Sequence, residues 1–408
     1  MFLGSATWPF VRSEWRFLLF GLLLTFWSGP GQTYVISLIG GEIRQDFALS
    51  HSAFGGLYTA ATLLSAACLW KAGPLVDRLP LKAFVFKMAL LMVVVTGMFS
   101  LVQGTITLFL GIFALRFAGQ GMLNHIALTA MARRYEKERG RALAIAGLGF
   151  PLGEALFPPL VVIGLTQTDW RTLWFILAAV MAVILLPLIP KLIVHTAEQD
   201  GGGALALNPA AVSDDTQWTR AEMLKDRRFY LLALTPITQS GIITALFFHQ
   251  VHLISLKDWD FGWWSLCFTF FAIFSLFGGL ISGFLVDIFR ARTIVPSLLL
   301  PLAAGLVVFG HVSHPAFAAV LMAILGFGAG ASNPALSALW PELYGTEHLG
   351  AIRSVFTVVM VFGSALGPVL LGAALDAQIE FEKITWFLAS ITIVAGLLAS
   401  LSLRKRSQ

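Results

Sequence analysis

Gly73-Pro-Leu-Val-Asp77-Arg78 recurs in the second half of the chain as Gly283-Phe-Leu-Val-Asp287, about 209 residues later. Five further positions repeat at an offset of 209, namely Gly119, Gly121, Asn124, Tyr135 and Glu138, which correspond to Gly328, Gly330, Asn333, Tyr344 and Glu347. Matches that keep one spacing over this length indicate an internal duplication. We therefore expect two related halves, with repeat-related polar residues facing each other between them.

The composition is that of a chain that crosses a membrane many times. Charged residues make up 12% of the chain, against about 25% in soluble proteins, and the mean hydropathy is +0.82. Twelve apolar stretches are long enough to span a bilayer as helices: 17–40, 54–70, 83–102, 105–131, 142–165, 172–190, 229–254, 262–289, 293–312, 315–339, 350–375 and 384–403. The sequence predicts an all-α membrane protein with two six-helix bundles related by pseudo-two-fold symmetry, 1–190 and 229–408, joined by a linker, 191–228.

The distribution of positive charge predicts the topology. With the N-terminus inside, 22 of the 27 Lys and Arg residues fall on the inner face, four fall on the outer face, and Arg116 lies within the membrane. This bias places both termini in the cytoplasm, and the compact loops favour a bacterial inner membrane. It also explains the net charge of +5 without a nucleic-acid partner. We expect the first apolar stretch to insert without cleavage.

The linker ends in Trp218-Thr-Arg-Ala-Glu222-Met-Leu-Lys225-Asp-Arg-Arg228, which predicts a short amphipathic helix on the inner membrane face. We interpret this segment as a tether, since nothing in the sequence supports a regulatory role. Cys68 and Cys267 lie in apolar stretches and are not repeat-equivalent, so neither a disulfide nor a metal site is expected. The sequence predicts no cofactor.

Three motifs resemble those of the major facilitator superfamily. The Gly73–Arg78 pattern with Lys82 resembles the signature loop between helices 2 and 3 of that family, and Gly283–Asp287 resembles the weaker copy between helices 8 and 9. Arg116-Phe-Ala-Gly119-Gln-Gly121 resembles the helix 4 motif. The resemblance covers the whole chain in helix count, orientation and motif positions. It implies a two-bundle transporter that works by alternating access, with helices 1, 4, 7 and 10 lining a central cavity.

Four amides fall on these cavity-lining helices. Asn124 matches Asn333 at the offset of 209, and Gln32 matches Gln239 at 207. Asn124 lies about 14 Å along the helix from Arg133, near the membrane midplane. Burying an unpaired amide costs about 1–3 kcal/mol, so each of these side chains needs a partner. We interpret them as substrate-binding residues; the alternative is that they bond a neighbouring helix.

Arg116 and Glu154 are ionisable residues deep in the membrane. They lie about 25 Å and 20 Å from the cytoplasmic ends of successive antiparallel helices, so the two could form a pair. Protonation of Glu154 would then free Arg116 to bind an anionic substrate. The alternative is a static pair that braces the two helices. Intramembrane charges are costly and are functional candidates by default.

Histidines offer a second route for protons. His249 and His252, near the outer end of helix 7, and His125 in helix 4 titrate near neutral pH when wetted. His249 is therefore a candidate proton-coupling residue. Packing of a histidine against polar neighbours is the alternative.

A set of charges at the cytoplasmic helix ends is a candidate gate. The resemblance implies that Asp77, with Arg78 beside it, lies opposite Arg353, and that Asp287 lies opposite Arg141. Contacts of this kind would close the inner side in one state and open in the other. The alternative is that these residues are boundary charges that only obey topology.

These observations together predict a secondary transporter of a small organic solute, coupled to protons and acting as a monomer. Arg116 favours an organic anion, and Glu-Met-Leu-Lys-Asp-Arg-Arg-Phe at 222–229 resembles bacterial monocarboxylate and oxalate–formate transporters. The cations expected in helices 8 and 11 of those relatives are missing. A drug or metabolite efflux antiporter is the alternative. It is weakened because helix 5, Gly147 to Glu154, only partly resembles the Gly/Pro motif of drug antiporters, and the tidier version, Gly363-Ser-Ala-Leu-Gly367-Pro368, lies in helix 11. An intramembrane enzyme is disfavoured because Ser332 has no histidine at matching depth, and a receptor without flux is the remaining alternative.

Overall fold

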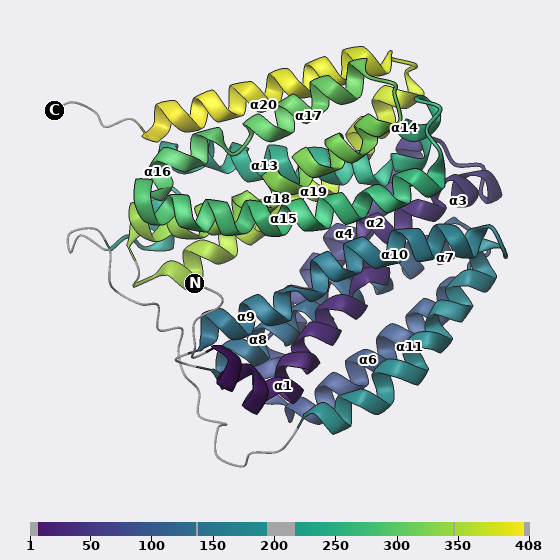
Figure 1. Ribbon diagram of the computed structural model, residues 1–408, viewed down its shortest axis with the longest axis horizontal. Coiled ribbons are helices and arrows are strands. Elements are labelled where there is room, and N and C mark those ends of the chain that lie inside the picture. The colour runs from purple at the N-terminus through teal and green to yellow at the C-terminus, as the bar shows by residue number, and fades with distance from the viewer. Residues whose placement is uncertain (1–6, 136–137, 194–216, 346, 404–408) are drawn as a thin grey trace. The chain divides into compact units, whose positions relative to one another are not determined.

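The computed structural model describes residues 7–135, 138–193, 217–345 and 347–403, and helices are the regular structure found in them (Figure 1). The predicted all-α fold is confirmed. The chain forms two compact units. Unit 1 comprises residues 1–47 and 60–204, and unit 2 comprises residues 48–59 and 205–408.

Unit 1 carries the elements of the first half. They are α1 (Thr7–Trp27), η1 (Gly29–Gly31), α2 (Thr33–Ile36), η2 (Ser37–Ile39), α3 (Gly40–Asp46), α4 (His51–Ala72), α5 (Leu75–Arg78), α6 (Leu81–Phe99), α7 (Thr105–Leu115), η3 (Arg116–Leu123), α8 (Asn124–Arg134), α9 (Arg139–Gly147), α10 (Gly149–Leu165) and α11 (Trp170–Leu192). Within the unit α6 packs along α11, and α1 packs against α8, α9 and α10 (Figure 1).

Unit 2 carries α12 (Arg220–Met223), α13 (Arg227–Phe248), α14 (Gln250–Ser255), α15 (Phe261–Phe289), α16 (Ala291–Ile294), η4 (Val295–Ser297), α17 (Leu300–His311), α18 (Ala316–Tyr344), α19 (Leu349–Asp376) and α20 (Phe381–Leu403). Its main pairs are α15 with α18, α13 with α19 and α17 with α20. The first half of α4, up to Thr59, also packs in this unit.

Eleven helical segments of the described chain are long and apolar enough to cross a membrane. The first predicted stretch, 17–40, is not one continuous helix, because it breaks after Trp27 into η1, α2, η2 and α3. Gly29-Pro30-Gly31 occupies the break, where proline has no N–H to donate and glycine weakens a helix. Several other helices begin at an acidic cap. Asp169 and Asp260, for example, accept hydrogen bonds from the first-turn amides of α11 and α15.

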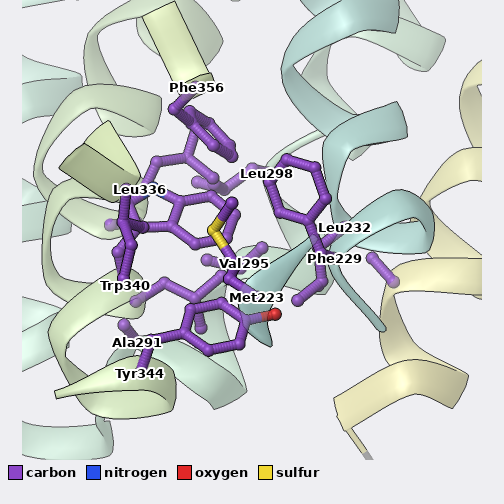
Figure 2. Close-up of a cluster of buried hydrophobic side chains, with 14 of the residues drawn as sticks. Met223, Phe229, Leu232, Ala291, Val295, Leu298, Leu336, Trp340, Tyr344 and Phe356 are labelled. Carbon is purple, nitrogen blue, oxygen red and sulfur yellow. The ribbon is translucent and has the colours of Figure 1, made fainter. Parts of the chain in front are cut away.

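The end of the linker belongs to the core of unit 2. Met223, in α12, is fully buried in an apolar cluster with Phe229, Leu232, Trp340 and Tyr344 (Figure 2). The helix itself is a single turn, so the predicted amphipathic helix is much shorter than the segment assigned to it. Because 194–216 lie outside the described residues, the predicted domain boundaries stay predictions.

Candidate functional site

The stretch 17–40, interrupted at Gly29–Gly31 and called here the broken first passage, supplies a backbone carbonyl to the interior of unit 1. Arg116 reaches two groups there: its Nη1 donates to the Gly31 carbonyl oxygen at 3.3 Å and lies 3.4 Å from the Thr33 hydroxyl. The Arg116 side chain is 1% exposed, so it is a fixed internal cation in this structure. Irregular backbone inside a membrane is tolerated where protein groups or a lined cavity satisfy it.

Arg116 also begins η3, an eight-residue π-helical stretch that ends at Leu123. π-Helical segments are rare and frequently mark functional sites. A Cβ atom added to Gly31 would lie 2.9 Å from the Gly119 Cα atom, with the Leu115 carbonyl oxygen closer still. The close approach of η1 to η3 therefore requires glycine, which gives a physical role to the first glycine of the helix 4 motif.

Asn124 follows η3 directly and is the first residue of α8. Its Nδ2 donates to the Gln120 carbonyl oxygen at 3.0 Å, whereas its Oδ1 is buried and has no hydrogen-bond partner in the described structure. An unsatisfied buried acceptor costs about 1–3 kcal/mol, so a donor from substrate or water would be favoured there. The Gln32 amide makes a local contact, in which Nε2 lies 3.4 Å from the Ser28 hydroxyl.

Glu154 lies in α10 and is partly buried. It forms no ion pair in the described structure, so the pairing of Arg116 with Glu154 expected from the sequence is wrong for this structure. The reason is that Arg116 points to the broken first passage. Glu154 instead lies near Tyr34, whose hydroxyl adjoins Gly153.

Gln239, the amide of unit 2 that corresponds to Gln32, forms hydrogen bonds to the neighbouring helix α18. Gln239 donates from Nε2 to the Gly328 carbonyl oxygen at 2.9 Å and accepts from the Ser332 hydroxyl at 2.5 Å. The side chain is 6% exposed, so its contacts match the alternative in which an amide bonds an adjacent helix. Asn333 is exposed. Ser332, which the sequence suggested only as a serine with no histidine at matching depth, is the partner of Gln239.

His249 joins a group of imidazoles that the sequence analysis did not assemble. The His51 ring centroid lies 5.4 Å from that of His249 and 4.3 Å from that of His252. His249 Nε2 lies 2.8 Å from the Pro368 carbonyl oxygen, to which it donates when it carries the ring proton. His51 comes from the start of α4, far from the other two in sequence. The described residues contain no His, Cys, Asp and Glu group with the geometry to hold a metal ion.

The two predicted gate pairs, Asp77 with Arg353 and Asp287 with Arg141, are not tested by the structure. Arg78, Arg141 and Asp287 are exposed, Arg353 is partly buried, and the Asp77 side chain lies outside the described structure. Each predicted pair joins different units, so both pairs stay predictions.

Two residues that the sequence analysis did not assign to the gate hold the α5 loop. Arg133 Nη1 donates to the Val76 carbonyl oxygen at 3.2 Å. His125 Nε2 lies 3.2 Å from the Gly73 carbonyl oxygen. The loop that carries the signature motif is therefore fastened to α8 through its backbone.

Comparisons with known proteins identify the family. The model of the Major Facilitator Superfamily matches residues 18–368 and again 257–408. A bacterial homolog of the human lysosomal transporter Spinster, in an inward-facing and unoccupied conformation, superimposes with a TM-score of 0.68 at 16% identity, covering 95% of this chain and 93% of that one. The nucleoside transporter NupG superimposes with a TM-score of 0.71 at 13% identity, covering 96% of this chain and 100% of that one. No match was found among curated proteins. The chain belongs to the Major Facilitator Superfamily, and it is an integral membrane transport protein rather than an enzyme.

Proposed function

We propose that this protein is a proton-coupled secondary transporter of a small organic anion, with both termini in the cytoplasm of a bacterial cell and the substrate bound along η1, η3 and the start of α8. The single observation that carries the proposal is the arrangement around Arg116. The buried Arg116 guanidinium contacts the break at Gly29–Gly31, and the unsatisfied Asn124 Oδ1 belongs to the segment that Arg116 begins. A cation attracts the carboxylate, and Oδ1 accepts from a hydroxyl, an amine or water.

Alternating access would have to uncover Arg116 before it can touch a substrate, because it is 1% exposed here. Two of the groups that it contacts here, the Gly31 carbonyl and the Thr33 hydroxyl, are neutral acceptors. A carboxylate is a stronger acceptor for guanidinium than either, since both partners are then charged. Substrate binding would therefore compete with the contact between Arg116 and η1.

Glu154 is the proton carrier in this proposal. An isolated ionised carboxylate in apolar surroundings is costly, whereas a protonated one is tolerated. With no ion pair to hold its charge in the described structure, Glu154 can accept a proton in one state and release it in another. Its neighbour Tyr34 belongs to the broken first passage, so a change of charge at Glu154 reaches the same segment that contacts Arg116.

The test is proton movement in proteoliposomes, reported by a pH-sensitive dye, when organic anions, cations and neutral metabolites are supplied in turn. Wild type should respond to one or more anions, and Glu154→Gln should lose proton movement while anion counterflow continues. Glu347→Gln is the matched control, because it makes the same change at an exposed carboxylate. A Glu154→Gln response equal to wild type would remove the proton role, and a response only to cations or neutral solutes would remove the anion assignment.

Efflux of a drug or metabolite is the second candidate, suggested by the glycines of α19. The structure gives these glycines a packing role, since a Cβ atom on Gly363 would lie 2.8 Å from the Ile237 carbonyl oxygen and Gly367 adjoins that of Gly241. α13 and α19 can therefore approach closely. Proton release driven by amphipathic cations, with no response to anions, would favour this candidate.

A further inference from the structure

Three of the histidines of unit 2, His51, His249 and His252, meet where separate elements converge. His51 begins α4, His249 follows the end of α13, and His252 lies in α14. His51 and His249 are 8% and 4% exposed, and His252 is partly buried. Three neutral imidazoles pack without electrostatic cost, but two charged rings at a centroid separation of 4.3 Å repel each other.

Other charged groups around the cluster already have partners. The Asp376 carboxylate, at the end of α19, accepts from the backbone N–H groups of His51 and Ser52 at 2.9 and 2.8 Å. It therefore caps α4 through both carboxylate oxygens. Lys257 Nζ donates to the Gly310 carbonyl oxygen at 2.7 Å. Glu380 pairs with Lys383, and Glu382 pairs with His311.

One side of the cluster borders a cavity. A cavity of about 350 Å³ is lined by His252, Leu256, Lys257, Gly310, Leu375, Gln378, Ile379, Glu380, Phe381 and Glu382. Of the three histidines, His252 lines this cavity. Its ring contacts that of His51, which in turn contacts that of His249.

The contacts beside the cluster bind the first half of α4 to the rest of unit 2. Thr59 donates to the Ala365 carbonyl oxygen, and the Phe248 ring lies 4.7 and 4.6 Å from those of Phe54 and Tyr58. A Cβ atom on Gly55 would lie 2.7 Å from the Pro368 carbonyl oxygen, which also receives His249. A displacement of His51 away from α14 would therefore also strain these contacts of the first half of α4.

We propose that His51, His249 and His252 form a proton-binding site, filled through the cavity at His252, whose protonation loosens the first half of α4 from α13, α14 and α19. The site deepens the proposed proton coupling and rests on it for its role in transport. One proton is accommodated by the cluster. A second places positive rings in contact, and the repulsion is relieved when the start of α4 moves away.

The titration of the site is measured in full-length protein in lipid nanodiscs, by deuterium exchange at the C2 position of each histidine across pH 5–9. In wild type, protonation of the cluster should extend over more than about two pH units, because the second proton meets the charge of the first. His252→Gln should narrow the titration of the remaining pair, whereas His314→Gln, at an exposed histidine, should leave it unchanged. Titration of all three as isolated imidazoles, unaffected by His252→Gln, would overturn the site.

Loosening of α4 is measured by backbone amide exchange in the peptide 48–59, corrected for the intrinsic pH dependence of exchange. Protection should fall with acidification by up to about tenfold per pH unit, the limit for linkage to one proton. The fall should disappear in His252→Gln and in His252→Asn, which guards against a defect peculiar to one replacement. Protection that ignores pH would overturn the proposal. Neither measurement needs substrate, so loss of the coupling assigned to Glu154 would leave both results standing.

Discussion

Replacement of Gly31 by alanine tests whether the contact between η1 and η3 organises unit 1. The added Cβ atom would lie 2.9 Å from the Gly119 Cα atom and 3.0 Å from the Gln120 nitrogen, and it would clash more severely with the Leu115 carbonyl oxygen. These are backbone atoms, so no side chain can rotate to make room. The broken segment must move away from η3 instead.

The size of the effect follows from two contributions. Overpacking in a closely packed interior costs about 1–3 kcal/mol. The same movement lengthens the bond from Arg116 to the Gly31 carbonyl oxygen, already 3.3 Å, and a hydrogen bond to a charged group is worth about 1.5–3 kcal/mol. The two overlap because one displacement causes both, so we expect a loss of roughly 2–5 kcal/mol.

The assay is thermal denaturation of the purified protein in one detergent, followed by size-exclusion fluorescence. Gly140→Ala is the matched control, since a Cβ atom there meets nothing within 4 Å and alanine favours the helix. Gly31→Ala should unfold at a clearly lower temperature than wild type and should lose anion counterflow, whereas Gly140→Ala should equal or exceed wild type. Equal midpoints for the two variants would refute the close contact of η1 with η3.

Three further predictions concern contacts elsewhere in the two units. Hydrogen bonds from Arg171 and then Trp170 hold the pKa of Asp46 below its usual range, so its stabilisation is present above that range and lost as pH falls through the lowered value; the thermal midpoints of wild type and Asp46→Asn should differ at pH 7 by an amount worth at most about 1 kcal/mol and converge below about pH 4. Gln239→Leu and Ser332→Ala should be non-additive by about 0.5–3 kcal/mol in a double-mutant cycle of unfolding, and additive values would contradict their hydrogen bond. Met223→Ala should destabilise unit 2 by about 2–5 kcal/mol and speed amide exchange in 217–226, and unchanged exchange would show that the buried methionine is not the anchor.

The sequence was sufficient for the fold because apolar length and charge asymmetry are local properties. It was insufficient for the first passage, since the stretch 17–40 is apolar throughout and hydropathy ignores the Gly29-Pro30-Gly31 break. That triplet was the available signal. The π-helix η3 had no comparable signal, because nothing in the local residue pattern demands a change of hydrogen-bond register.

Repeat matching also has a limit that Gln239 makes clear. An offset can align positions along two helices, and it aligned Asn124 with Asn333. It does not say which face of a helix meets its neighbour. Ser332 precedes Asn333 by one residue, or about 100° around the helix, and this rotation brings the serine to Gln239 while the asparagine is exposed.

The duplication therefore accounts for the scaffold, whereas the two intramembrane charges of the proposed site lie where the halves differ. At the offset of 209, Arg116 corresponds to Leu325, a buried apolar residue of α18. At the same offset Glu154 corresponds to Gly363, which packs closely against Ile237 of α13. A buried charge is costly and persists only when something offsets the cost. Because unit 2 keeps the fold without either charge, stability alone does not demand them in unit 1, and this agrees with the roles proposed for Arg116 and Glu154 in substrate and proton binding.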